Sequence, residues 1–159
     1  MKLFNLVLLF VTVTIGYSQT NSNKMRMVDF SPKSKAYNIY YPSTYVVTED
    51  EDIVTFTNAE SGLNITISTY DFSTKIQEYK ILEVLSGFVT DIKKSDWKSY
   101  QSKFDNLIEG RIAKKNDNWI WWGISLNKRA VFISINKANA INDDDIKLMR
   151  FIIDKLEIH

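Results

Sequence analysis

Two segments near the end of the sequence, residues 119–126 and 129–136, limit the possible folds most strongly. Each has the composition of a β-strand, and only Asn127 and Lys128 separate them. Asparagine tolerates the positive φ that a two-residue hairpin turn requires, so we expect an antiparallel hairpin. In its register three apolar pairs share one face: Ile124 with Val131, Trp122 with Ile133, and Ile120 with Ile135. We expect this continuous apolar face to pack against a core.

Further strands are predicted along most of the chain. The clearest is residues 63–68, in which three apolar residues alternate with polar ones at the period of a half-buried strand. The acidic stretch at residues 49–52 is interpreted as a solvated loop. The other predicted strands are residues 37–41, 53–57, 98–104, 107–114 and 156–158.

Two segments have the apolar spacing of helices. The first is residues 75–94, which follow a capping box of the form Thr74-x-x-Gln77. The second starts at Asn142 or Asp143 and ends near residue 155, and its first aspartates complement the positive end of the helix dipole. The sequence therefore predicts a single α+β domain, an antiparallel sheet of about six or seven strands flanked by two main helices.

The hairpin that precedes residues 119–126 determines where the candidate binding residues lie. A turn of even length would carry Glu109 and Arg111 into the core, so we prefer a turn of odd length. The odd turn sends Ile108 and Ile112 to the core face and leaves the arginine outside, where guanidinium can stack on indole. The predicted surface patch consists of Arg111, Trp119, Trp121 and Phe132.

Residues 1–18 have the features of a secretory signal peptide, with one positive charge followed by a short apolar run and small residues before the predicted cut. Cleavage is predicted between Ser18 and Gln19. Residues 19–35 are polar without apolar periodicity and are interpreted as a flexible lead-in to a domain over residues 36–159. We therefore expect an exported protein, periplasmic or extracellular, with no membrane insertion after signal cleavage.

Charge and cysteine content exclude several classes of protein. The chain has 20 Lys and Arg against 19 Asp and Glu, and loss of Lys2 with the signal peptide removes the net charge. A balanced charge argues against nucleic-acid binding, which favours a basic face. With no cysteine there can be no disulfide, thiolate nucleophile, cysteine-ligated zinc or lipid-anchored cysteine. We expect no cofactor and no metal.

No residue pattern in the chain predicts catalysis. The only histidine is His159, the last residue of the sequence, so a Ser-His-Asp triad or a histidine-ligated zinc site is not expected. Asp71, Glu78 and Lys80 superficially match the carboxylate set of some nucleases, but Glu78 falls in a predicted helix and is read as part of a solvated helix face. The acidic runs lack the alternating ligands and glycine of an EF-hand loop. We expect no glycan on Asn64, because its sequon lies within a strand.

Residues 37–43, Tyr-Asn-Ile-Tyr-Tyr-Pro-Ser, begin a pattern that continues through residues 53–56, a glycine turn and the strand at 63–68. In this pattern, from Ala36 to His159, the chain resembles PsbP/Mog1-like domains, as a secreted bacterial member. Such domains often open with an aromatic-aliphatic strand that ends in Tyr-Pro-Ser and finish with a strand, a helix and a short strand. The resemblance implies an antiparallel sheet flanked by helices, used mainly as a protein-binding scaffold in photosystem assembly, nuclear transport and bacterial immunity to secreted toxins. It implies no catalytic residues.

Two functions follow as expectations. The first is a non-catalytic, exported protein-binding module, with neutralisation of a secreted toxin as one form of that role. The alternative is a domain that binds a sugar or lipid through the same patch. Trp119 and Trp121 could instead pack under a helix, because a sheet of this class can carry helices on both faces. An enzyme that uses Asp71 and Glu78 is the third and weakest reading.

Overall fold

The computed structural model describes residues 25–90, 92–93, 96–114 and 117–159. The predicted signal peptide and its cleavage site at Ser18 and Gln19 lie outside these residues. The described elements are, in chain order, β1 (Met27–Phe30), β2 (Tyr37–Pro42), β3 (Val46–Asp50), β4 (Ile53–Thr57), β5 (Asn64–Asp71), α1 (Glu78–Phe88), β6 (Lys98–Ser99), β7 (Asn106–Lys114), β8 (Asp117–Leu126), β9 (Arg129–Lys137), α2 (Asp143–Lys155) and β10 (Glu157–Ile158).

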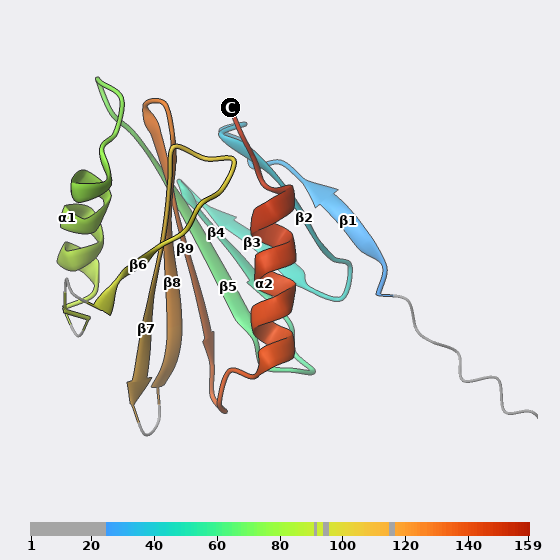
Figure 1. The fold of residues 1–159 in the computed structure, drawn as a ribbon. Helices are drawn as coiled ribbons and strands as arrows, with labels where there is room; N and C mark the ends of the chain where they lie inside the picture. Colours follow the sequence, from blue (N-terminus) through green and yellow to red (C-terminus); the bar gives the residue numbers. More distant parts are fainter. Residues whose placement is uncertain (1–24, 91, 94–95, 115–116) are drawn as a thin grey trace, which may run out of the picture.

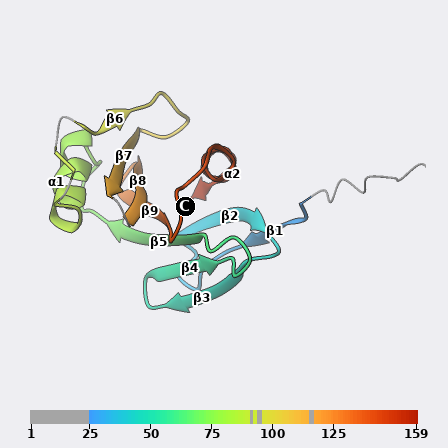
Figure 2. The same ribbon diagram turned by 90° about the horizontal axis from the view of Figure 1, so that it is seen from below.

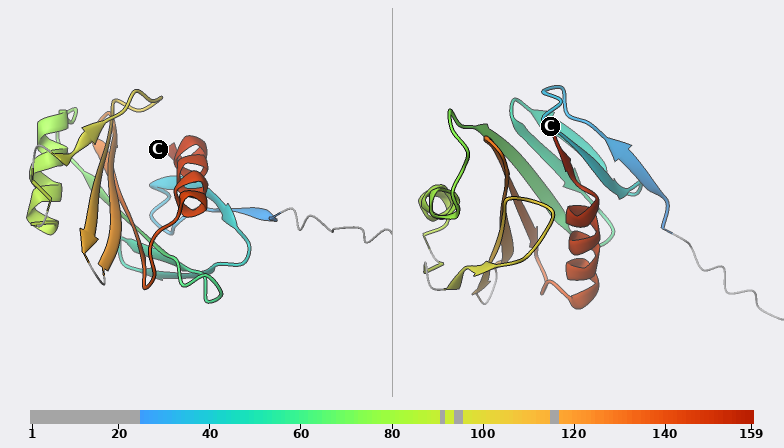
Figure 3. Two further views of the ribbon diagram at one scale, coloured as in Figure 1. Left: turned by 60° about the horizontal axis from the view of Figure 1, so that its bottom comes forward. Right: turned by 45° about the horizontal axis from the view of Figure 1, so that its top comes forward.

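Within the described residues, seven strands form one antiparallel sheet in the order β3-β4-β5-β9-β8-β7-β6, and β1-β2-β10 form a smaller one. Helix α1 covers one face of the large sheet, and α2 lies on the other side (Figure 1). The large sheet bends around α2 and β2, as Figures 2 and 3 show. The α+β prediction, with two main helices and one antiparallel sheet, is confirmed. Neither described helix is long and apolar enough to cross a membrane.

The β8–β9 hairpin has the predicted register, with Ile124 opposite Val131 and Trp122 opposite Ile133. Asn127 in its turn has a φ of 56°, the left-handed conformation that the turn demands. The central strands are apolar on both faces, so the described residues form two apolar clusters. The larger lies under α2 and the small sheet, and the smaller lies under α1.

The N-terminus of α2 is capped, and the helix starts within the predicted range. Asn142 is the N-cap, and its side-chain oxygen accepts hydrogen bonds from the backbone N–H groups of Asp144 and Asp145. The Asp145 carboxylate accepts in return from the Asn142 backbone N–H, at 2.9 Å. Asp145 is also buried and pairs with Lys137 of β9, so the cap fixes the end of the helix against the sheet.

Two strands appear where no strand was predicted. β1 lies within the stretch interpreted as a flexible lead-in, and it pairs with the free edge of β2. There Phe30 contacts the rings of Tyr41 and Phe56, so tertiary contacts order a segment that lacks periodicity of its own. β3 includes part of the predicted acidic loop, and its backbone pairs with β4 as an edge strand. Charged side chains are common on such edges.

Two predicted elements are shorter than expected. The helix predicted over residues 75–94 is only α1, and its N-cap is Gln77 without a side-chain hydrogen bond, so the predicted capping box is wrong. The helix closes where the Val89 backbone N–H donates to the Leu85 oxygen, although Val89 and Ile92 remain buried beyond it. Their apolar spacing reflects burial of a non-helical segment. Of the strand predicted at 98–104, only β6 forms. Phe104 is buried although it lies in a loop, so its apolar character again reflects burial and not a strand.

Candidate functional site

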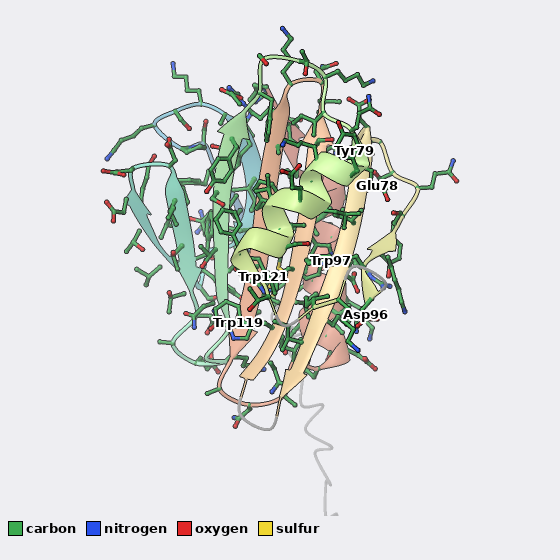
Figure 4. All side chains as sticks on the ribbon, turned by 90° about the vertical axis from the view of Figure 1, so that its left-hand side faces the viewer. Glu78, Tyr79, Asp96, Trp97, Trp119 and Trp121 are labelled. Atoms are coloured by element: carbon green, nitrogen blue, oxygen red, sulfur yellow. The ribbon has the colours of Figure 1, made fainter. Side chains whose placement is uncertain are left out.

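The predicted pair of tryptophans is present on one face of β8. The rings of Trp119 and Trp121 stack with centroids 5.7 Å apart and an interplanar angle of 15°. Figure 4 shows both, with Trp97, on the side of the sheet that α1 crosses. Both tryptophans are half-buried, and Trp121 packs against the smaller apolar cluster. The pair is therefore held in place by packing against the cluster under α1 and still exposes part of its surface to solvent.

Phe132 lies on the same face, as predicted, but only 2% of it is exposed because α1 covers it. Its ring contacts Tyr70 and Phe88, with centroids 5.4 and 6.3 Å away. Phe88 lies in the predicted helix and is 54% exposed. The accessible aromatic residues in contact with Phe132 are thus Tyr70 of β5 and Phe88 of α1, which the sequence analysis did not include in the patch.

Arg111 lies on the opposite face, and its predicted place beside the tryptophans is wrong. Arg111 faces Ile120 and Glu109 faces Trp122, so the β7–β8 turn has even length. The rejected register is stable because the buried carboxylate is satisfied. The indole Nε1 of Trp122 donates to one oxygen of Glu109 at 3.0 Å, and Arg111 Nε donates to the other at 2.7 Å.

The two isoleucines used to choose the register also lie on the other face from the one predicted. Ile108 is buried in the cluster under α1, and Ile112 packs against the same cluster. Ile108 faces Gly123, where the lack of a side chain leaves room for the helix. Both faces of β7 pack against an apolar cluster. The apolar character of a residue in β7 therefore does not show on which face its side chain lies.

Beyond the tryptophans the same face of the sheet is polar. The register places Trp121 beside Ser134 and then Thr66, and Trp119 beside Asn136 and then Asn64. Of the described helices, α1 crosses the sheet over β8 and neither helix lies over β3 and β4 on this side (Figure 4). We call this surface the tryptophan face and define it by Trp119, Trp121, Asn136, Asn64 and Thr66.

One side-chain hydrogen bond orders part of the tryptophan face. Asn64 Nδ2 donates to Asn136 Oδ1 at 3.1 Å, which fixes both amides across the β5–β9 boundary. The Nε1 atoms of Trp97 and Trp121 are buried, and neither has a hydrogen-bond acceptor among the described residues. The tryptophan face thus carries amide and hydroxyl groups beside two stacked indoles.

A second candidate is a pocket on the other side of the sheet. It has a volume of about 360 Å³ and lies between residues 100–104, strands β7 and β8, and α2. Glu109 and Trp122 contribute to its lining, so the buried carboxylate described above belongs to this pocket. The sequence analysis did not predict this pocket, because the register it preferred for the β7–β8 hairpin kept Glu109 out of the core.

The residues considered for catalysis do not form one site. Asp71 pairs with Arg129, whose hydrogen bonds and charge hold the pKa of the Asp71 carboxyl below its ordinary value. Glu78 accepts a hydrogen bond from Ser99, and Lys80 pairs with Glu83. Each group thus has a separate partner. In the part of the chain that the structure describes, no three acidic or histidine side chains are grouped as metal ligands.

Comparisons with known proteins identify the fold. No family model matches the sequence, and no curated protein matches it. The solution structure of the cyanobacterial PsbP protein CyanoP, from Synechocystis, is similar with a TM-score of 0.63 at 8% identity, over 85% of this chain and 94% of CyanoP.

A crystal structure of a protein from Bacteroides thetaiotaomicron is similar with a TM-score of 0.62 at 15% identity, over 82% of this chain and 48% of that one. The chain therefore spans about half the length of the Bacteroides protein. The chain has a PsbP/Mog1-like fold, which confirms the resemblance seen in its sequence.

Proposed function

We propose that the chain is an exported, non-catalytic protein-binding module whose contact surface is the tryptophan face. The stacked pair of Trp119 and Trp121 carries this proposal. Tryptophan is enriched at the energetic centres of protein interfaces, where a large rigid ring meets a partner and polar groups surround it. Here the indoles are half-buried, Trp121 packs against the cluster under α1, and the pair adjoins the hydrogen-bonded amides of Asn64 and Asn136.

Three further observations support a binding role. Domains of the PsbP/Mog1-like kind, which the sequence resembles, serve mainly as protein-binding scaffolds. Asp71, Glu78 and Lys80 each have a separate partner in the fold, which supports a non-catalytic role. Tyr70 and Phe88 add exposed aromatic surface beside α1. Export rests on the predicted signal peptide, and neutralisation of a secreted toxin is one of the forms of the role that the resemblance implies.

The alternative binding mode, a sugar or lipid held between the tryptophans and Arg111, loses its arginine because Arg111 lies on the opposite face. That position makes Arg111 a useful control. The surface of the tryptophan face can also be changed without altering the core, because Thr66 is flanked by Thr55 and Ser134 and points away from the larger cluster.

The test is site-specific photo-crosslinking in the native cells, with a crosslinking amino acid at position 66 or at position 111. We expect a crosslinked protein from position 66 and none from position 111. N-terminal sequencing of the protein that carries the crosslinking amino acid should give Gln19 as its first residue, as the predicted signal cleavage requires. Trp119→Ala and Thr66→Lys should each reduce capture of that protein at least about tenfold, the loss expected of an interface centre.

Arg111→Ala should leave capture unchanged. Near-ultraviolet circular dichroism of each variant separates lost contact from lost folding, and Thr66→Lys keeps the measurement informative if Trp119→Ala unfolds. Equal capture by the Thr66→Lys and wild-type proteins would show that the partner binds elsewhere.

A further inference from the structure

The pocket between residues 100–104 and α2 has the size of a small-molecule site. Its volume of about 360 Å³ falls in the range of about 300–1,000 Å³ typical of ligand pockets. The loop that follows β6 reaches toward α2 and forms one wall (Figure 1). Lys103 Nζ donates to the backbone oxygen of Asp154 at 2.6 Å, which ties this loop to the last turn of the helix.

A buried carboxylate lines the pocket. Glu109 is 5% exposed, and its two oxygens are held by Trp122 Nε1 and Arg111 Nε. A carboxylate offers about four acceptor positions, so each oxygen keeps capacity for one more donor. Arg111 already balances the charge, so a neutral hydroxyl fits the remaining capacity better than a second cation.

The opposite wall carries a cation that is available to a ligand. Arg150 of α2 lines the pocket, and its side chain has no hydrogen-bond or ion-pair partner among the described residues. A guanidinium binds a carboxylate through two parallel hydrogen bonds. The nearby Asp154 carboxylate pairs with Lys155, at 3.5 Å, and Lys103 adds positive charge to the wall.

Apolar side chains line the pocket between these two polar walls. They are Phe104, Leu107, Trp122 and Ile153. We propose that this pocket binds an acidic sugar, with ring hydroxyls donating to Glu109, the carboxylate bound by Arg150, and the C–H face of the ring against the apolar side chains. This site lies on the opposite side of the sheet from the tryptophan face, so it does not depend on the proposed protein-binding function.

The test is isothermal titration calorimetry of the mature protein, residues 19–159, with D-glucuronate and D-galacturonate as probes and D-glucose and D-galactose as their neutral counterparts. At least one uronate should bind at least about tenfold more tightly than its neutral counterpart, because only the uronate engages Arg150. The same preference should appear in the tryptophan fluorescence, since Trp122 lines the pocket. Absence of binding by both uronates, or equal affinity for acid and neutral sugar, would overturn the proposal.

Variants assign the binding to this pocket. Arg150→Gln should weaken the uronate at least about tenfold and abolish the preference for the acid. Lys147→Gln is the matched control, because Lys147 lies on the same helix and does not line the pocket. Thr66→Lys, on the tryptophan face, should bind the uronate like the wild type, which separates this proposal from the first. Unchanged uronate binding by Arg150→Gln contradicts the assignment.

Discussion

Glu109 shows at the residue scale how hydrogen bonding decides which face of a strand is buried. A carboxylate under a helix is costly unless its oxygens are bonded, and the sequence pattern favoured the register that avoids that cost. The indole of Trp122 and the guanidinium of Arg111 supply the bonds, both from the same face of the hairpin. A buried acid with two donors costs far less than an isolated one.

Tyr37 is the opposite case, a buried polar group without a partner. Tyr37 is 1% exposed, and its hydroxyl has no hydrogen-bond partner in the part of the chain that the structure describes. Burial, and next the charge of Glu49, raise the pKa of Tyr37. Tyr37→Phe should raise the free energy of unfolding by about 1 kcal/mol, because it removes an unsatisfied buried hydroxyl. Urea denaturation monitored by circular dichroism measures the change.

Tyr45 is the matched control for this prediction. It is also buried, with a pKa raised to about 12 by burial and then by the Asp145 charge, but its hydroxyl is hydrogen-bonded to Ser61. Tyr45→Phe should therefore lower the free energy of unfolding by about 1 kcal/mol. A loss of stability in Tyr37→Phe equal to that in Tyr45→Phe would mean that the Tyr37 hydroxyl has a bonding partner.

At the scale of the element, glycines allow close packing on the α1 side of the sheet. A Cβ on Gly123 of β8 would lie 2.4 Å from Ile81 Cγ2 and 2.7 Å from Leu85 Cδ1, both on α1. Gly110 of β7 stands in the same relation to Trp97, with a Cβ that would lie 2.6 Å from the indole. The small residues thus let the helix and a tryptophan pack directly on the sheet backbone.

Two glycine substitutions should have opposite effects. Gly123→Ala should lower the free energy of unfolding by about 1–3 kcal/mol, because the new methyl group displaces α1 from the sheet. Gly87→Ala, inside α1, should raise it by about 0.5–1 kcal/mol, because a Cβ there meets no atom within 4 Å and alanine favours the helix. Thermal and urea unfolding of both variants test this, and a neutral Gly123→Ala would place α1 farther from the sheet.

At the scale of the whole molecule, Arg129 joins the two sheets. Its guanidinium donates to the Asp71 carboxylate within the large sheet. The same group donates to the backbone oxygens of Ala36 and His159, which flank β2 and β10 of the small sheet. One side chain thereby links segments that are distant in the sequence.

The Asp71–Arg129 pair should make stability depend on pH. The pKa of Asp71 is lowered in the fold from an ordinary value of 3.8, first by its hydrogen bonds to Arg129. The pair therefore stabilises the fold above that value, and the contribution is lost as pH falls through the lower folded pKa. Because Asp71 is 65% exposed, Asp71→Asn should cost less than about 1 kcal/mol near neutral pH. The difference from wild type should vanish near pH 2, and a difference that persists there contradicts the assignment.

The local pattern of the sequence determined the positions of several helices and strands of this protein. The spacing of apolar residues placed α2, β5 and the β8–β9 hairpin, because each buries one face and repeats at its own period. Residues 37–43 and the strands after them indicated the PsbP/Mog1-like fold. The tryptophan pair was predicted on its correct face because residues two apart in one strand point to the same face of the sheet.

Tertiary structure alone decided the rest. β1 and β3 form because neighbouring strands offer them backbone partners, which no property of their own sequences reveals. The β7–β8 register depends on the Trp122 and Arg111 donors that satisfy Glu109, and on apolar cover over both faces of the sheet. Sequence period specifies which residues share a face, whereas the partners across the sheet determine which face is buried and where a charge can be held.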